Sequence, residues 1–321
     1  MKILLLGANG QLGRTFMDYA GLDQARQLQI DRASRHEWIA ASRDGVLTGG
    51  GSGEIADLAA PDSLPALLDR VQPDVIINAA AYTAVDRAEQ EPDLANRVNG
   101  EAVAVLGGWA KAHAVLLIHY STDYVFDGGQ SQPYAVDAPT APLGAYGRSK
   151  LAGEQALRDS GADHLILRTA WVYAAHGQNF LRTMLRLGSE RDELRVVADQ
   201  HGAPTDTKLI VRASLAALDR WQQADAEQRR QLSCTHHLVA SGATTWHGFA
   251  TAIFEQAGTH GLITHKPRVI PITTADFPTP AVRPAWSLLD NSGFQQHFEF
   301  LLPDWRQGLD EVMRQLTRSG H

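Results

Sequence analysis

Tyr146 and Lys150 have the residue types and the spacing needed for proton transfer. Side chains four positions apart on a helix share one face and can meet. An ammonium next to a phenol favours the phenolate, so we expect Lys150 to lower the pKa of Tyr146 and make it a usable proton relay. Lowering a phenol pKa from about 10 to about 7–8 requires about 3–4 kcal/mol. One charge at about 4 Å and an effective dielectric of about 20 supplies about 4 kcal/mol.

Other polar residues stand where they could assist this chemistry. Thr122 ends an expected strand, and its hydroxyl could bind a substrate carbonyl beside Tyr146, with a helix cap as the alternative. Asn99 is a poor helix former inside an expected helix, which indicates that it holds a water molecule or backbone in a proton relay. Trp171 ends the next strand and is expected to line the substrate pocket. His119 lies in an apolar segment, and we interpret it as packing.

A glycine-rich turn near the amino end predicts the cofactor. Gly7, Gly10 and Gly13 follow an apolar strand at 2–6 and open a helix. Glycines there permit a tight turn, close approach of the backbone to a pyrophosphate and close helix–sheet packing, while the helix amino terminus offers free N–H groups. We therefore interpret this turn as a dinucleotide-binding loop, with a plain tight turn as the alternative.

The preference between NADH and NADPH stays open in the sequence. Asp31 lies near the expected end of the second strand, where a carboxylate binds the adenosine ribose and favours NAD. Arg32 and Arg35 follow, and they could hold the extra phosphate of NADP or be solvated surface charges. Small residues at 78–83 end another strand, which suits contact with adenine and ribose.

The elements that must position these residues alternate between apolar, β-branched runs and helical patterns. This alternation predicts an α/β fold of Rossmann type, a doubly wound parallel sheet. The expected strands are 2–6, 74–79, 115–120, 164–171 and 236–240. The expected helices are 10–20, 64–70, 92–113, 143–159, 206–221, 244–256 and 303–318. Because 321 residues exceed one core, we predict a dinucleotide-binding domain of 1–173 and 206–240, and a smaller carboxyl-terminal α/β substrate domain of 174–205 and 241–321.

The bulk composition restricts the class of partner. A net charge of −7 argues against nucleic acid or an anionic membrane as the main partner, whereas a few arginines can still bind an anionic small molecule. No apolar run approaches the roughly 20 residues of a membrane helix. Cys234 is the single cysteine of the sequence, which fits a reducing compartment. We therefore expect a cytoplasmic enzyme that acts on a small molecule.

Longer motifs resemble the extended short-chain dehydrogenase/reductases and, within them, the dTDP-4-dehydrorhamnose reductase family. They extend nearly end to end and lie at 7–13, 73–81, 119–126, 146–154, 168–173, 200–205 and 237–242. The resemblance implies that NADPH or NADH reduces the C4 ketone of dTDP-4-dehydro-L-rhamnose to dTDP-L-rhamnose, a precursor of polysaccharides such as O-antigen. In that reaction hydride comes from the nicotinamide and the proton comes from Tyr146.

The resemblance also implies residue roles. Tyr146 and Lys150 would be catalytic and would also touch the cofactor, and Thr122 would tune the proton transfer. Asp123 and Trp171 would contact the sugar nucleotide. Cofactor contacts would come from Gly10, Gln11, Leu12, Asp31, Asp57, Leu58, Ala81, Tyr82 and Thr83.

Two further positions bear on the ligands. Arg283 lies in a proline-rich carboxyl-terminal segment and is our candidate for a diphosphate contact, with a plain surface arginine as the alternative. Some relatives join two subunits through Mg²⁺ with a glutamate just after the glycine loop, where this chain has Thr15. We assign no metal ligands and keep a homodimer as one option.

Two competing functions stay open. A dehydratase or epimerase on the same scaffold is the first, but dehydratases resemble a Thr-Asp-Glu site, and here Tyr124 follows Asp123. A non-catalytic binding protein is the second, because the regulatory subunit of methionine adenosyltransferase also resembles this family. An intact set of Thr122, Tyr146 and Lys150 favours the enzyme.

Overall fold

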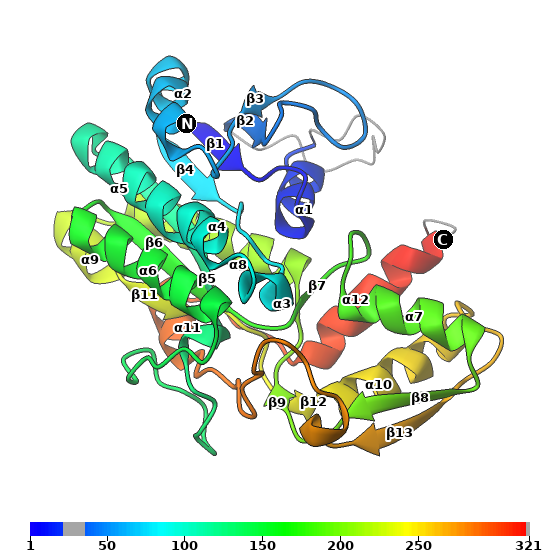
Figure 1. The fold of residues 1–321 in the computed structure, drawn as a ribbon. Helices are drawn as coiled ribbons and strands as arrows, with labels where there is room; N and C mark the ends of the chain where they lie inside the picture. Colours follow the sequence, from blue (N-terminus) through cyan, green and yellow to red (C-terminus); the bar gives the residue numbers. More distant parts are fainter. Residues whose placement is uncertain (22–35, 319–321) are drawn as a thin grey trace.

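A parallel sheet of seven strands forms the centre of the computed structural model, which describes residues 1–21 and 36–318 (Figure 1). Every adjacent pair of strands in it is parallel. The strand order reverses between β1 and β4, and ligands of such sheets bind at the carboxyl ends beside this reversal. In sheet order the strands are β3 (Glu54–Ile55), β2 (Glu37–Ser42), β1 (Lys2–Leu6), β4 (Val75–Asn78), β5 (Leu116–Thr122), β6 (His164–Thr169) and β11 (Thr235–His237).

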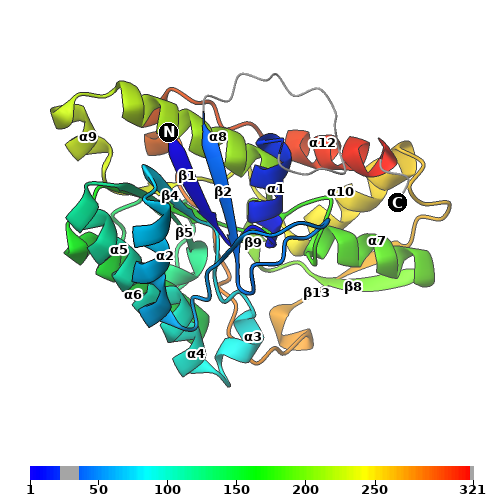
Figure 2. The ribbon, with the colours of Figure 1, turned by 90° about the horizontal axis from the view of Figure 1, so that it is seen from above.

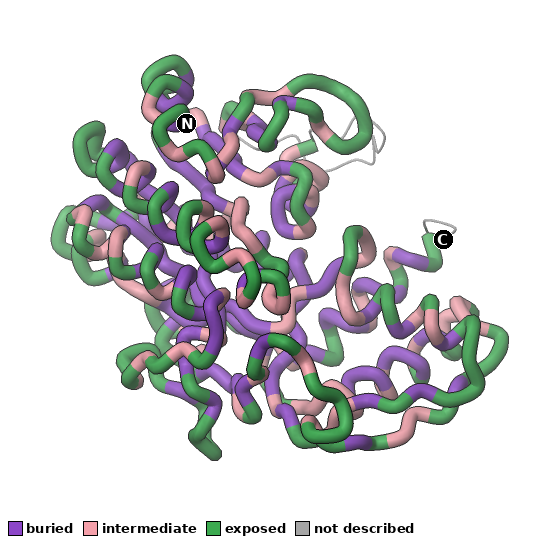
Figure 3. The backbone as a smooth tube through the Cα atoms, in the orientation of Figure 1, coloured by how far each residue is buried: buried purple, intermediate pink, exposed green. Residues whose placement is uncertain are grey.

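Helices cover both faces of this sheet because successive strand side chains point to opposite sides. Ile3 and Leu5 pack into one hydrophobic cluster with α1 and α8, and Leu4 and Leu6 pack into another with α2, α5 and α6. Figure 2 shows the two helix layers on either side of β1 and β2, and Figure 3 shows the buried strands between them. The predicted doubly wound fold is confirmed. The helices are α1 (Gln11–Tyr19), α8 (Thr207–Gln223), α2 (Leu64–Val71), α5 (Ala102–His113) and α6 (Ala145–Ser160).

Two elements that the sequence predicts as continuous are interrupted in the structure. The helix expected at 92–113 consists of α4 (Pro92–Asn96), a π-helical turn (Arg97–Glu101) and α5. The strand expected at 164–171 ends at Thr169, and β7 (Val172–Tyr173) follows after Trp171. π-helical turns frequently accompany functional sites, and this one contains Asn99.

The second strand lies later in the chain than predicted. It ends at Ser42 rather than near Asp31, and Asp31, Arg32 and Arg35 lie outside the described residues. The glycine-rich segment after β2 folds back on itself through a bridge between Val46 and Ser52.

The carboxyl-terminal elements gather beside one end of the sheet (Figure 1). There α7 (Phe180–Glu190), α10 (Trp246–Thr259) and α12 (Trp305–Arg318) accompany a two-stranded parallel sheet of β8 (Glu193–Val197) and β13 (Arg268–Ile272). The hydrophobic cluster around α8 continues into α10 and α12, so the division into two domains stays a prediction. None of the helices in the described ranges has the length and apolarity to cross a membrane. The shorter elements are α3 (Val85–Ala88), β9 (His201–Gly202), β10 (Thr205–Asp206), α9 (Ala226–Leu232), β12 (Thr244–Thr245) and α11 (Ser292–Phe298).

Candidate active site

No side-chain hydrogen bond caps the amino terminus of α1, which follows the glycine loop. Gly7 has a φ of +80°, and a Cβ added to it would lie 2.6 Å from the backbone nitrogen of Ala80. A Cβ on Gly13 would lie 2.0 Å from the carbonyl oxygen of Gly7. Gly10 caps α1 in an extended conformation and without a side chain. Close backbone packing and an uncovered helix amino terminus fit the pyrophosphate of a dinucleotide.

We expect Gly13→Ala to weaken NAD(P)H binding by at least about tenfold, because the new methyl group forces the loop away from its position. Fluorescence titration of the coenzyme measures this loss. Gly108→Ala is the matched control, since nothing lies within 4 Å of its added Cβ on the exposed side of α5. Coenzyme affinity equal to that of the wild type in Gly13→Ala would contradict the assignment of the loop.

The other predicted cofactor residues differ in how they are held. Gln11 begins α1, and its Oε1 accepts a hydrogen bond from Asn179 Nδ2 at 2.8 Å. The side chains of Leu12 and Leu58 are buried in the hydrophobic clusters, so only their backbone atoms are available to a ligand. Asp57 lies half-buried after β3. Nothing in the described structure tests their cofactor contacts, which stay predictions.

Asn99 fixes the backbone that follows β4. Its Oδ1 accepts a hydrogen bond from Tyr82 N at 2.9 Å, and its Nδ2 donates to Tyr82 O and to Ser149 Oγ, both at 3.0 Å. Asn99 therefore holds backbone, which confirms that part of the expectation, and its place in a proton relay stays a prediction. The Tyr82 hydroxyl donates to Glu91 Oε2 at 2.6 Å. The segment 81–83, predicted to contact the cofactor, is thus held from both sides.

Thr122 and Tyr146 meet at the carboxyl end of β5. The Thr122 side chain lies close enough to the Tyr146 phenol to act on its pKa, and Thr122 Oγ1 donates to Asp123 Oδ1 at 3.0 Å. Thr122 in addition caps the short turn after β5 by accepting from Tyr124 N at 3.2 Å. The Tyr124 ring packs edge-on against the Tyr146 ring with centroids 5.5 Å apart. Both interpretations of Thr122, cap and site residue, agree with this geometry.

Tyr146 is a weaker acid in this structure than a free phenol. Loss of hydration raises its pKa to about 12, the nearby Thr122 hydroxyl opposes that increase, and the negative charge of Asp123 adds to it. A phenol with this pKa is fully protonated at neutral pH. In this form its hydroxyl carries a proton that it could donate.

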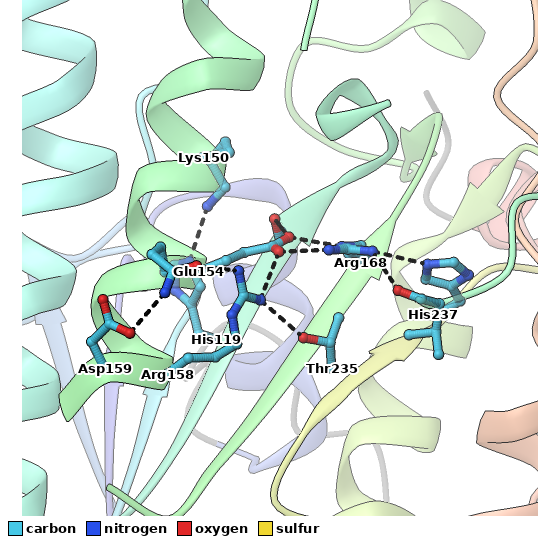
Figure 4. Close-up of polar contacts among 11 residues, drawn as sticks. His119, Lys150, Glu154, Arg158, Asp159, Arg168, Thr235 and His237 are labelled. Carbon is cyan, nitrogen blue, oxygen red and sulfur yellow. Dashed lines mark hydrogen bonds and ion pairs between the residues drawn. The ribbon is translucent and has the colours of Figure 1, made fainter. Parts of the chain in front are cut away.

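Lys150 does not act on Tyr146 as predicted. Its Nζ turns toward β5, where it donates to Tyr120 O at 2.6 Å and lies 3.3 Å from His119 Nε2 (Figure 4). His119 Nδ1 in turn lies 3.1 Å from Asn78 Nδ2. Burial lowers the pKa of Lys150 to about 8. The prediction that its charge lowers the Tyr146 pKa is therefore wrong in this structure, and His119, interpreted as packing, is a polar partner of Lys150 as well.

Asp123 and Arg283 bring unpaired polar atoms to the same region. Asp123 is buried, and within the described residues its Oδ2 makes no hydrogen bond of ordinary length, although the Ser287 side chain lies near enough to lower its pKa. Arg283 Nη2 binds Asp86 Oδ2 at 2.8 Å, while its buried Nη1 finds no partner among the described residues. The charge of Arg283 also acts on Tyr124, so the carboxyl-terminal segment reaches the site. These positions fit the predicted substrate contacts, and Asp86 is a partner that the sequence did not indicate.

We expect Asp123→Asn to stabilise the protein at neutral pH. Burial raises the Asp123 pKa to about 6, above the roughly 4 of an unfolded chain, so the ionised form disfavours folding. The penalty is absent below about pH 4, grows between about pH 4 and 6, and reaches up to about 3 kcal/mol above pH 6. Thermal unfolding should show a Tm gain at pH 8 that disappears toward pH 4. An equal gain at both pH values would contradict the raised pKa.

Trp171 adopts a left-handed backbone conformation with a φ of 49°. Its indole stacks on Trp246 of α10 with centroids 3.6 Å apart and an interplanar angle of 8°. Gly202 allows this position, because a Cβ there would lie 2.4 Å from Trp171 Cε2. A left-handed conformation in a non-glycine residue is a strained one that often accompanies ligand sites. Trp171 stays half-buried, as a pocket-lining role requires, and that role stays a prediction.

A buried ion-pair network centred on Glu154 holds α6 in place (Figure 4). The Glu154 carboxylate is fully buried and binds Arg168 through Nε at 2.9 Å and Nη2 at 2.8 Å. Ser121 Oγ donates to the same carboxylate at 2.5 Å, and Arg158 Nη1 does so at 3.1 Å. The network thereby connects α6, which carries Tyr146, with β5, which carries Thr122, and with β6.

Thr15 has a structural position. Its buried hydroxyl bonds to Thr207 Oγ1 at 2.8 Å and joins α1 to α8. Across residues 1–21 and 36–318, no group of three His, Cys, Asp or Glu side chains gathers so that it could hold a metal ion. A role for Mg²⁺ and a homodimer are not tested by this structure.

Comparison with known proteins agrees with this geometry. The family model described as "RmlD substrate binding domain" matches residues 1–318. A dTDP-4-dehydrorhamnose reductase of Burkholderia thailandensis is 43% identical over 98% of this chain and 99% of its own. Solved structures of such reductases from Clostridium acetobutylicum (TM-score 0.84, 32% identity) and Bacillus anthracis, the latter in complex with NADP (TM-score 0.80, 29% identity), each match 98% of this chain and 99% of theirs. The chain therefore belongs to the dTDP-4-dehydrorhamnose reductase family.

Proposed function

We propose that this protein reduces the C4 ketone of dTDP-4-dehydro-L-rhamnose to dTDP-L-rhamnose with a reduced nicotinamide coenzyme, as a step in polysaccharide precursor synthesis. The neighbouring hydroxyls of Thr122 and Tyr146 at the carboxyl end of β5 carry this proposal. The glycine loop after β1 opens at the same edge of the sheet. The names of the relatives support the substrate and the reaction.

Each residue of the site has its own role in the reduction of a ketone. A reduced nicotinamide coenzyme held at the glycine loop would supply hydride to the carbonyl carbon. Tyr146, protonated at neutral pH because burial raises its pKa to about 12, donates its proton to the oxygen on which negative charge develops. The Thr122 hydroxyl lies beside that of Tyr146 and can bind the same oxygen. Lys150 ties α6 to the Tyr120 carbonyl of β5 and so fixes the distance between Tyr146 and the strand end.

Arg283 supplies positive charge for the substrate. Its unpaired Nη1 is buried while its Nη2 is held by Asp86, so the guanidinium is fixed before a ligand arrives. An oriented guanidinium suits a diphosphate oxygen. The single Cys234 supports placing the protein in the cytoplasm.

The competing functions are less well supported. A dehydratase needs a second carboxylate beside Asp123, and Tyr124 occupies that position while Asp86 is engaged by Arg283. A purely regulatory protein does not require the paired hydroxyls of Thr122 and Tyr146.

The test is consumption of NADPH or NADH by the purified protein with dTDP-4-dehydro-L-rhamnose, with the product identified by mass spectrometry and NMR. We expect stoichiometric formation of dTDP-L-rhamnose. Coenzyme binding without turnover would overturn the proposal in favour of the binding protein. Loss of water from a dTDP-hexose without net coenzyme consumption would overturn it in favour of the dehydratase.

A further inference from the structure

The carboxyl end of β2 lies directly beside the glycine loop. The backbone nitrogens of Gly7 and Ala8 both donate to the carbonyl oxygen of Ala41 at 3.0 Å, and Ser42 is the last residue of β2. In dinucleotide-binding sheets, the side chains just after this strand meet the adenosine ribose. A carboxylate there binds the 2′-hydroxyl of NAD, whereas an arginine accommodates the 2′-phosphate of NADP.

The side chains at this position favour the phosphate. Ser42 ends the strand without a carboxylate, and Arg43 follows with 86% of its side chain exposed. Arg43 Nε lies 4.0 Å from Asp57 Oδ1, a distance at which an exposed ion pair is weak. The nearest carboxylate in sequence, Asp44, is engaged in its own turn, where Oδ1 accepts from Val46 N at 3.1 Å and from Ser42 Oγ at 3.2 Å.

The turn after Arg43 is fixed against the glycine loop. Asn9 Nδ2 donates to Val46 O at 2.7 Å, and Asn9 Oδ1 accepts from Thr48 N at 2.8 Å. The turn closes on itself through a hydrogen bond from Gly53 N to Gly45 O at 2.7 Å. Arg43 therefore precedes a turn that hydrogen bonds hold against the glycine loop, the loop that fits the pyrophosphate.

We propose that Arg43 selects NADPH over NADH by binding the 2′-phosphate of the coenzyme. This rests on the proposed function, in which the glycine loop binds a nicotinamide dinucleotide. A guanidinium can contact two phosphate oxygens at once, and a phosphate dianion is a stronger competitor for it than the carboxylate of Asp57 4.0 Å away. Arg43 thereby takes the position at the end of the second strand that the sequence had suggested for Asp31.

The test compares Arg43→Ala and Arg43→Lys with the wild type in two measurements. Steady-state kinetics gives kcat/KM for NADPH and for NADH, and calorimetry gives the affinities of 2′,5′-ADP and 5′-AMP without any turnover. We expect Arg43→Ala to lower kcat/KM for NADPH and the affinity for 2′,5′-ADP by about 10–100-fold, which is the usual effect of losing a charged hydrogen bond. The ratio of NADPH to NADH efficiency should fall by the same factor. Arg43→Lys should recover part of the loss.

Arg186→Ala is the matched control, because Arg186 is an exposed arginine on α7 that also pairs with a carboxylate, Glu190. The inference is overturned if the wild type binds 2′,5′-ADP no better than 5′-AMP, or if Arg43→Ala leaves their ratio unchanged. Because the binding of the two nucleotides is measured without turnover, its outcome does not depend on the proposed reaction. The protein could bind 2′,5′-ADP better than 5′-AMP only when Arg43 is present and still fail to reduce the keto sugar. That result would refute the proposed reaction and leave Arg43 as the residue that selects the coenzyme.

Discussion

Tyr146→Phe is expected to lower kcat for ketone reduction by about 10³-fold while coenzyme affinity stays near that of the wild type. The substitution removes the hydroxyl that donates the proton and keeps the ring that packs against Tyr124. General acid catalysis typically contributes about 10²–10⁴-fold, and the loss of this hydroxyl should remove that contribution. Single-turnover kinetics and fluorescence titration of the coenzyme measure the two quantities separately.

Tyr134→Phe is the control for that experiment. It removes the hydroxyl that bonds to Asp127 Oδ1 at 2.6 Å and keeps a ring stacked on Phe126. Its effect should be confined to stability, with kcat within about threefold of the wild type. Turnover in Tyr146→Phe within tenfold of the wild type would remove Tyr146 from the proton-donor role.

Arg168→Met is expected to destabilise the fold by about 3–5 kcal/mol, because it leaves the fully buried Glu154 carboxylate without its main partner. Urea unfolding at neutral pH measures this loss. Arg158→Met is the control on the same carboxylate, since the Arg158 side chain is 34% exposed and should cost no more than about 1 kcal/mol. The double variant with Glu154→Met should recover much of the loss, since no buried charge remains.

The pH dependence gives an independent check on this pair. Burial raises the Glu154 pKa, but the hydrogen bonds and charge of Arg168 with the bonds from Ser121 and Arg158 outweigh it, so the folded-state pKa is lowered. The stability from this group is therefore present above the unfolded pKa of about 4.3 and is lost as the pH falls through the folded value. Without Arg168, burial dominates and the pKa rises. The deficit of Arg168→Met should thus be smaller at pH 5.5 than at pH 8, and a pH-independent deficit would contradict this account.

Local patterns were sufficient to predict the sheet and the positions of the main site residues. The apolar runs at β1, β4 and β5 are buried on both sides, so composition alone identifies them. The helix that starts at Ala145 places Tyr146 at the end of β5 next to Thr122, as the strand–helix alternation predicts. The second strand was missed because Glu37–Ser42 begins and ends with polar residues and contains two alanines, which is a weak strand signal.

Contacts between side chains far apart in sequence could not be predicted in this way. The spacing of Tyr146 and Lys150 gives a shared helix face, but the direction of the ammonium depends on the Tyr120 carbonyl, a stronger partner supplied by β5. Arg283 meets Asp86 across 197 positions, and no local pattern indicates that pairing. Such contacts depend on how the elements pack, which a single sequence does not contain.

The stacked indoles of Trp171 and Trp246 give the protein an internal optical probe. Because their rings are parallel and 3.6 Å apart, their electronic transitions couple and should produce a near-ultraviolet circular dichroism band that Trp246→Phe abolishes. One indole stands at the end of the central sheet and the other begins α10, so the band reports the alignment of these two parts. The intensity of this circular dichroism band could then report the binding of an unlabelled sugar nucleotide, without coenzyme and without catalysis.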